Sequence, residues 1–266
     1  MNSKIGIGII TCNRPEYFSK LLDSLPDIEN IVVVNDGKPY ENQVYSSKIK
    51  TIIQHQKNRG VGKSKNDALK YLLANKCKHI FLFEDDIALK NTSLLEKYIK
   101  AGEVSGILHF NYAYHGKLNR NDDGSPKIRK IIKYNDINIA LHFHLTGALS
   151  YFKDEVLKNI GLIDERYKNI LEHVDHTYQI IKYGYHPPFR WFADLEDSFT
   201  SIQELDIYFA NSIINPNNKR KLKYKIYLNY LYFALKNGCR PSRIPLVDDV
   251  ELVKELEKIR KAHSIV

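Results

Sequence analysis

Hydrophobic residues recur along the first third of the chain in two alternating patterns. Continuous apolar runs predict strands buried on both faces at 5–11, 31–34, 49–53 and 80–83. Apolar residues spaced three and four positions apart predict helices at 17–25 and 68–73. Asn13 and Pro15 are typical of a helix start, so Asn13 is expected to cap the first helix. This alternation predicts an α/β fold with a mostly parallel central sheet flanked by helices.

The later pattern is less regular. It predicts strands at 106–110, 139–145 and 189–192, and helices at 153–160, 171–183, 219–236 and from about 248. Residues 115–136 are expected to form a loop or hairpin. In 139–145 the alternation places His142 and His144 on the face opposite the apolar residues. Ser201 and Glu204 have the spacing of a capping box, which predicts a helix from 201 to about 213.

Composition narrows the class of protein. The three cysteines among 266 residues are far apart and odd in number, which indicates neither a disulfide framework nor a zinc site and favours a reducing, cytoplasmic compartment. We see no signal peptide and no apolar run of about 20 residues that could cross a membrane. The net charge is +9, and residues 217–243 hold eight Lys or Arg and no acid.

An acidic triplet, Glu84-Asp85-Asp86, directly follows the most apolar strand. Side chains alternate along a strand, so Glu84 and Asp86 are expected on one face and Asp85 on the other. Three adjacent carboxylates are tolerated when a cation or hydrogen-bond donors lie among them. Open α/β sheets bind their ligands at the carboxyl ends of their strands, so the triplet is a candidate site; an acidic turn that caps the next segment is the alternative.

The loop Gly60-Val61-Gly62-Lys63-Ser64 ends like a phosphate-binding P-loop. That motif needs a further Gly at position 57, where this chain has Lys57, so the sequence argues against an ATPase. A glycine-rich turn before a helix still favours anions. We therefore expect Lys63 and nearby backbone donors close to a diphosphate.

The order of these motifs over about residues 4–200 resembles the family-2 inverting glycosyltransferases, which have the Rossmann-like nucleotide-diphospho-sugar (GT-A) fold. The resemblance implies a UDP-sugar pocket with Asp36 at the uracil, Glu84 at the ribose and Asp86 holding a divalent ion, Mn²⁺ or Mg²⁺, at the diphosphate. The other residues it assigns to nucleotide-sugar binding are Thr11, Asn13, Arg14, Asn58, Gly60, Lys63, Asn66 and Asp85. Thr146-Gly147-Ala148 is similar to the acceptor-side segment, with Gly147 and Ala148 facing the acceptor, and 161–165 to the family's Gly-x-Phe-Asp-Glu.

The resemblance also implies a division of the chain. Residues 1–200 would form the transferase domain, with a nucleotide-sugar half at about 1–110 and an acceptor half at about 111–200. Residues 201–266 would form a helical extension. The implied reaction is metal-dependent transfer of a hexosyl or N-acetylhexosaminyl group, with inversion, to a glycan or lipid-linked acceptor.

Two positions depart from the family pattern. Asn35 replaces an acid after the second strand, and His173 stands where the general base is usually an Asp. Histidine titrates near neutrality and can accept a proton without tuning. We expect His173 to be the base, with Glu172 and Asp175 as alternatives.

Other function classes remain open. A sugar-nucleotide nucleotidyltransferase would share the sheet but should have a Gly-rich, Arg-containing loop after its first strand, where this chain has Thr11-Cys12-Asn13. A non-catalytic nucleotide-sugar-binding module would keep the pocket and lack a working base. For the basic segment 217–243 we expect no nucleic acid. Its tyrosines at 224, 227, 230 and 232 are expected to pack against the domain or to contact the inner face of a membrane peripherally. The simpler interpretation is that they lie on a solvated helix face.

Overall fold

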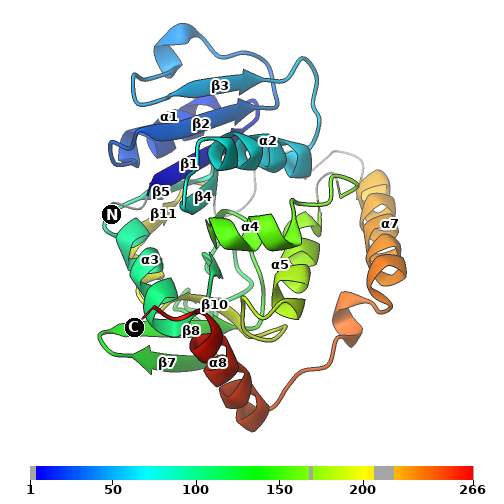
Figure 1. Cartoon of the computed structure of the whole chain (residues 1–266). Coiled ribbons are helices and arrows are strands. Elements are labelled where there is room, and N and C mark those ends of the chain that lie inside the picture. Colours follow the sequence, from blue (N-terminus) through cyan, green and yellow to red (C-terminus); the bar gives the residue numbers. More distant parts are fainter. Residues whose placement is uncertain (1–3, 168–169, 207–218, 266) are drawn as a thin grey trace.

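The computed structural model describes residues 4–167, 170–206 and 219–265. Its central sheet has six strands in the order β3-β2-β1-β4-β9-β6 (Figure 1). The parallel strands are β1 (Ile5–Thr11), β2 (Asn30–Asn35), β3 (Thr51–Gln54) and β4 (His79–Glu84). β9 (Leu149–Lys153) runs antiparallel to β4 and to β6 (His109–Asn111). The mostly parallel sheet expected from the sequence is therefore confirmed.

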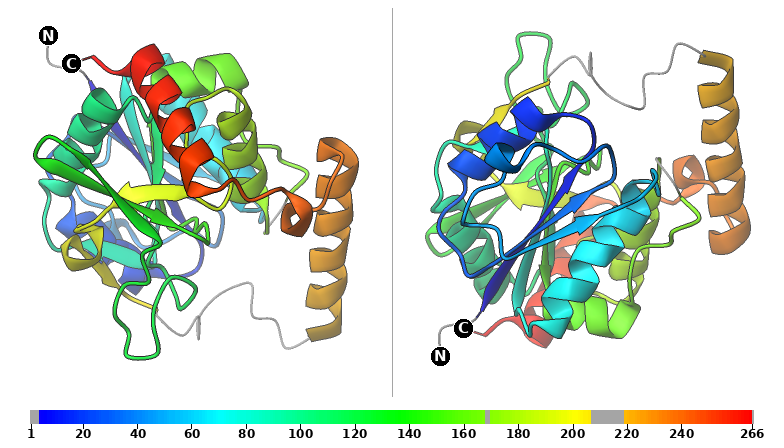
Figure 2. Two further views of the ribbon diagram at one scale, coloured as in Figure 1. Left: turned by 90° about the horizontal axis from the view of Figure 1, so that it is seen from below. Right: turned by 90° about the horizontal axis from the view of Figure 1, so that it is seen from above.

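Helices cover both faces of this sheet (Figures 1 and 2). One face packs against α1 (Pro15–Ser24), α3 (Leu94–Ser105) and α8 (Asp249–His263). The other face packs against α2 (Val61–Ala74), α4 (Asp154–Ile160) and α5 (Glu172–Lys182). At Gly8 an added Cβ would lie 2.8 Å from the Ala68 side chain, so this glycine lets α2 approach β1 closely.

Two smaller sheets lie beside the central one. β7 (Lys130–Tyr134), β8 (Ile137–His142) and β10 (Phe192–Leu195) form an antiparallel sheet in the order β10-β8-β7. β5 (Ile87–Leu89) pairs with β11 (Ile202–Glu204) just beyond the acidic triplet. The remaining elements are α6 (Ser198–Ser201), α7 (Lys219–Asn237) and the 3₁₀ turns η1 (Asn42–Val44) and η2 (Pro241–Arg243).

Several local predictions were wrong. Asn13 does not cap α1; its backbone is left-handed, with φ 55°, and its Oδ1 accepts a hydrogen bond from Lys38 N. Ser201 ends a short helix instead of starting one, because Ile202 is buried and the next residues pair with β5. Residues 207–213 of that predicted helix lie outside the described residues.

Two strand predictions were shifted by tertiary contacts. β8 ends at His142, which is fully buried, so the predicted alternation of polar and apolar faces does not hold through residue 145. The strand expected at 189–192 begins only at Phe192, because Arg190 has a left-handed backbone with φ 68°.

Candidate active site

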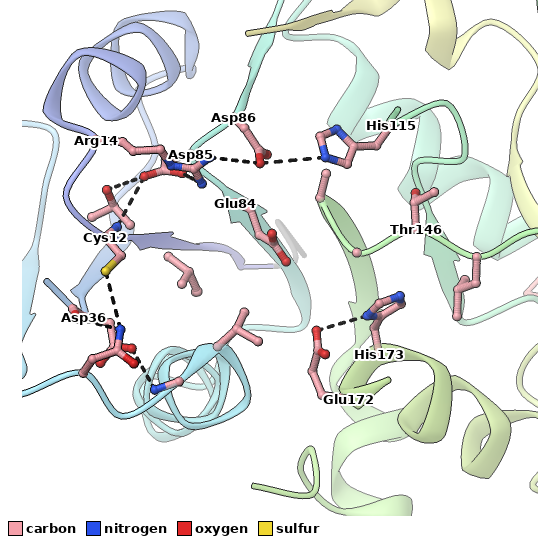
Figure 3. Close-up of a pocket in the computed structure, with 18 of the residues that line it drawn as sticks. Cys12, Arg14, Asp36, Glu84, Asp85, Asp86, His115, Thr146, Glu172 and His173 are labelled. Carbon is pink, nitrogen blue, oxygen red and sulfur yellow. Dashed lines mark hydrogen bonds and ion pairs between the residues drawn. The ribbon is translucent and has the colours of Figure 1, made fainter. Parts of the chain in front are cut away.

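A cavity of about 290 Å³ opens where β1, β2 and β4 end (Figure 3). Its N-terminal wall consists of residues from these strand ends, from the loops after them, and from the loop between β3 and α2: Ile10, Thr11, Cys12, Arg14, Asp36, Asn58, Gly60, Val61 and Glu84-Asp85-Asp86. The facing wall comes from later segments: His115, Leu118, Leu145, Thr146, Gly147, Ala148, Glu172 and His173. The fold thus gathers side chains from both predicted halves around one space.

The acidic triplet does not follow strand alternation, because β4 ends at Glu84 and the chain turns at Asp85 and Asp86. Thr11 Oγ1 donates a hydrogen bond of 2.6 Å to Asp85 Oδ2, and the Arg14 guanidinium contacts both Asp85 and Asp86 (Figure 3). Burial raises the pKa of Asp85 to about 7, and the positive charge of Arg14 opposes that rise. Arg14 therefore supplies the positive charge that these clustered carboxylates need.

Asp86 lies between Arg14 and His115, a residue that the sequence analysis missed. His115 Nε2 is 3.8 Å from Asp86 Oδ2, and its Nδ1 is 3.5 Å from Glu204 Oε1. Burial alone would lower the pKa of His115, but Glu204 and Asp86 raise it. His115 was missed because it lies in a loop with no motif around it. Glu204 comes close to it because β11 pairs with β5.

The residues at Asp86 fit a divalent cation that is shared with a substrate. Asp86 lines the cavity. Its Oδ1 is buried and has no hydrogen-bond partner among the described residues. In the described ranges no group of three His, Cys, Asp or Glu could hold a metal alone. Magnesium is commonly held by one or two carboxylates together with substrate phosphates, and Asp86 suits that arrangement.

Asp36 organises the loop that follows β3. Its carboxylate accepts hydrogen bonds from Arg59 N at 2.7 Å and Gly60 N at 2.8 Å, and it contacts His55 Nδ1 at 2.6 Å. Asn58 Nδ2 donates to the Asp36 backbone oxygen at 3.2 Å. The conformation of this loop therefore depends on a carboxylate at position 36.

Three predicted nucleotide-sugar residues do not line the cavity. Lys63 Nζ pairs with Asp67, which also contacts His55 Nε2. Asn66 donates a hydrogen bond of 2.8 Å to Ile163 O and so holds the 161–165 segment. Asn13, as described above, holds the turn after β2.

Lys65, two residues beyond Lys63, connects the two walls of the cavity. Its buried Nζ lies 2.7 Å from Glu84 Oε1, 3.2 Å from Glu172 Oε1 and 3.3 Å from Gly147 O. Burial alone would lower the pKa of Lys65, but the two carboxylates raise it. Nothing in the local sequence distinguishes Lys65 from Lys63, because the two differ only in the direction in which α2 points their side chains.

Glu172 and His173 form a pair at the start of α5. His173 Nδ1 lies 3.1 Å from Glu172 Oε1, and the two side chains face the cavity together (Figure 3). Glu172 is 3% exposed, and its Oε2 has no hydrogen-bond partner among the described residues. Burial alone would raise the pKa of Glu172, but His173 and Lys65 lower it. Gly147 leaves room for the pair, since an added Cβ would lie 3.2 Å from His173 Nδ1.

Asp175 is directed away from the cavity. Its carboxylate contacts Lys236 Nζ at 2.5 Å and Asn237 Nδ2 at 2.9 Å, both on α7. His176 is also buried, with Nε2 3.1 Å from Gly161 O. Glu172, Asp175 and His176 are all buried although they are polar, because α5 is enclosed between the sheet and α7.

No protein-family model matches the chain, and no curated protein matches it. Among solved structures it is similar to TarS 1–349 of S. aureus in complex with UDP: 20% identity, TM-score 0.50, covering 66% of this chain and 54% of that chain. A second S. aureus TarS structure has 18% identity and a TM-score of 0.51, covering 96% of this chain and 48% of that chain. The chain thus spans about half the length of these TarS structures.

A mannosyltransferase from Pyrobaculum calidifontis, PcManGT in complex with GDP-Man and Mn²⁺, is 12% identical with a TM-score of 0.45, covering 97% of this chain and 85% of that chain. A likeness at that TM-score supports no conclusion about this chain. The two TarS likenesses show the fold, which is the GT-A-like fold that the order of motifs predicted.

Proposed function

We propose that this protein is a glycosyltransferase that moves a sugar from a nucleotide diphospho-sugar to a hydroxyl group of a glycan or lipid-linked acceptor. The observation that carries the proposal is the two-walled cavity. The strand ends with their acidic triplet form one wall, and Gly147, Glu172 and His173 belong to the other. Figure 3 shows the triplet on one side of the cavity and the Glu172–His173 pair on the other. A donor on the first wall would therefore present its sugar to an acceptor on the second. The proposed division into a nucleotide-sugar half (1–110) and an acceptor half (111–200) follows these walls.

A uridine nucleotide is the proposed donor. The TarS structure with the same fold contains UDP. On the donor wall, Asp36 and Asn58 lie beside the ends of β1 and β2, where open α/β sheets bind nucleotides. Glu84 and Arg14 complete the polar surface on which the ribose and diphosphate would lie.

A divalent cation, Mn²⁺ or Mg²⁺, is proposed at Asp86, with His115 as its neighbour. When bound there, such a cation would neutralise negative charge on the departing diphosphate. Arg14, which already contacts Asp85 and Asp86, contributes positive charge to the same region.

His173 is the proposed general base. If Nδ1 donates its hydrogen to Glu172, the lone pair of Nε2 is left to accept a proton. The acceptor oxygen would lose its proton to Nε2 and form a bond to the anomeric carbon from the face opposite the leaving group. The bond from that carbon to the diphosphate oxygen breaks, and the nucleoside diphosphate leaves with the electron pair, which inverts the anomeric configuration. Glu172 orients the imidazole and stabilises its charged form.

Thermal unfolding in the presence of UDP-hexoses, UDP-N-acetylhexosamines and GDP-sugars, each with and without manganese, tests this proposal. A ligand at about 100 times its dissociation constant adds about 2.7 kcal/mol to the free energy of unfolding. We expect UDP-sugars to raise the melting temperature, whereas free hexoses and ATP leave it unchanged. Mixing the stabilising UDP-sugar with glycan acceptors should then release UDP. Stabilisation without UDP release for any acceptor would favour a non-catalytic binding module, and equal stabilisation by ATP would contradict the proposal.

A further inference from the structure

Helix α7 is anchored to the rest of the protein along one side. Phe233 is fully buried against the Tyr178 ring of α5, and Tyr232 packs on Tyr167 with its hydroxyl donating to Asp164 Oδ2 at 2.8 Å. Lys236 and Asn237 bind Asp175, so the last turn of α7 is tied directly to α5. The helix therefore has a defined inner face and stands at the edge of the molecule (Figures 1 and 2).

The outer face of α7 is apolar. Five side chains are exposed along it: Tyr224 (63%), Tyr227 (57%), Leu228 (41%), Leu231 (39%) and Leu235 (76%). Their spacing of three and four residues places them on one stripe of the helix, and Phe233 lies on the opposite side. Of the four tyrosines considered in the sequence, Tyr232 packs on Tyr167, whereas Tyr224 and Tyr227 are mostly exposed.

Two cations flank the outer stripe among the side chains that the structure describes. Lys223 and Lys225 are exposed on α7, and the segment 217–243 contains eight Lys or Arg without an acid. An apolar stripe of Tyr and Leu flanked by cations is the pattern of helices that lie in the plane of a membrane interface. Anionic lipid headgroups attract such cations, and tyrosine rings favour the headgroup level.

Other occupants of the outer stripe fit less well. Single-stranded nucleic acid would also be attracted to the cations, but its bases stack on aromatic rings, and three of the five stripe residues are leucines. A second copy of the chain would have to bring an equally basic α7 against this one, and like charges would oppose that contact. In the described part of the chain no helix is long and apolar enough to cross a membrane, so α7 would lie on the surface.

We propose that the outer stripe of α7 binds the surface of an anionic lipid bilayer. Tyr224, Tyr227, Leu228, Leu231 and Leu235 would enter the interface, while the flanking lysines would contact the headgroups. The contact through Asp175 joins this surface-bound helix to the element that carries Glu172 and His173. The inference does not depend on the proposed transfer reaction, because lipid binding can be measured without catalysis.

Co-sedimentation of the full chain with vesicles of phosphatidylcholine and phosphatidylglycerol in equal parts tests the proposal. We expect binding at low ionic strength that falls with added salt, and much weaker binding to pure phosphatidylcholine. The double variant Leu228→Ser/Leu231→Ser removes two stripe side chains without touching the inner face, and its vesicle partition coefficient should fall by about tenfold or more. The matched control is Val250→Ser/Val253→Ser on α8, where both residues are also exposed (66% and 43%).

Several outcomes would overturn the proposal. The proposal is wrong if the full chain does not bind anionic vesicles at low salt. It is also wrong if the Leu228→Ser/Leu231→Ser variant binds them as strongly as the wild type. Equal loss in the α8 control would show that any apolar truncation has this effect. Analytical ultracentrifugation tests whether the outer stripe instead binds a second copy of the chain. That would be the conclusion if the full chain is a dimer that does not bind vesicles and the stripe variant is a monomer. Circular dichroism of both double variants must match the wild type, since Phe233 and the other anchors are unchanged.

Discussion

Lys65 and Glu172 are 107 positions apart in the sequence, yet Lys65 Nζ lies 3.2 Å from Glu172 Oε1 inside the protein. The same Nζ lies 2.7 Å from Glu84 at the end of β4. One buried cation thus holds a carboxylate on each wall of the cavity. The spacing between the proposed donor and acceptor sides therefore depends on a residue that need not touch either substrate.

Replacing Lys65 with Met should lower the free energy of unfolding, because two carboxylates lose their common cation while Glu172 stays buried. Breaking a buried ion pair by removing one partner typically costs about 3–5 kcal/mol. We expect the free energy of unfolding, measured by urea titration, to fall by that order. Lys65→Arg keeps the charge and should recover part of the loss.

Lys70→Met on the same helix is the matched control for Lys65→Met. Lys70 is largely exposed and its nitrogen lies 4.0 Å from Glu165, and surface pairs of this kind contribute about 0–1 kcal/mol. A loss at Lys65→Met no larger than that at Lys70→Met would contradict the role of Lys65 as the link between the walls.

Substitutions of His173 and Asp175 should affect turnover differently, because only His173 is proposed as the general base. His173→Ala should reduce turnover by about 10²–10⁴-fold with little change in donor affinity, because a general base acts in the transition state. Asp175→Asn should leave the chemical step nearly intact, since Asp175 contacts α7 and does not line the cavity. Glu172→Gln should give an intermediate loss of turnover, because the imidazole loses the carboxylate that contacts its Nδ1. Near-normal turnover of His173→Ala together with inactive Glu172→Gln would transfer the role of base to Glu172.

Asp86→Asn tests the proposed metal site. Calorimetry of UDP binding should show higher affinity in manganese than in chelator for the wild type, and no difference for Asp86→Asn, because the variant lacks the carboxylate charge at that position. Asp123→Asn, in an exposed loop, serves as the control and should behave as the wild type. Equal affinity of the wild type in manganese and chelator would exclude a metal bridge.

Buried histidines should make the fold sensitive to acid. Burial lowers the pKa values of His176 and His186 to about 4, below the value of about 6.5 in an unfolded chain. Between these two pH values the unfolded state binds more protons than the native state, so stability falls as the pH falls from about 6.5 to about 4. Each histidine contributes about 1.4 kcal/mol per pH unit at full effect.

Urea unfolding at a series of pH values measures this dependence. His176→Gln should reduce the slope between about pH 6.5 and pH 4, because one proton-binding site is removed from the unfolded chain. An unchanged slope in this variant would show that His176 is not held neutral in the native state.

Much of the fold was evident in the sequence. The runs that became β1, β2 and β4 are so apolar that burial on both faces was the only way to shield them from water, and helical spacing identified α1, α2 and α8. The acidic triplet could be placed at a strand end, and Thr11, Asp36, Gly60 and Gly147 were predicted around the cavity that they now line. The strands, the helices and the place of the triplet follow from local periodicity and from the rule that parallel strands end at one edge of a sheet. The four cavity residues were expected only from the resemblance to the glycosyltransferase family.

What only the tertiary structure decided was which polar side chains meet. Lys65 rather than Lys63 reaches the cavity wall, His115 comes next to Asp86, and Asp175 is directed to α7, although nothing in the local pattern separates these residues from their neighbours. Glu204 was expected in a helix and instead lies in β11, because pairing with β5 satisfies its backbone. The free energy of a buried charge depends on partners that folding brings from distant positions, and such partners leave no periodic signal in the sequence.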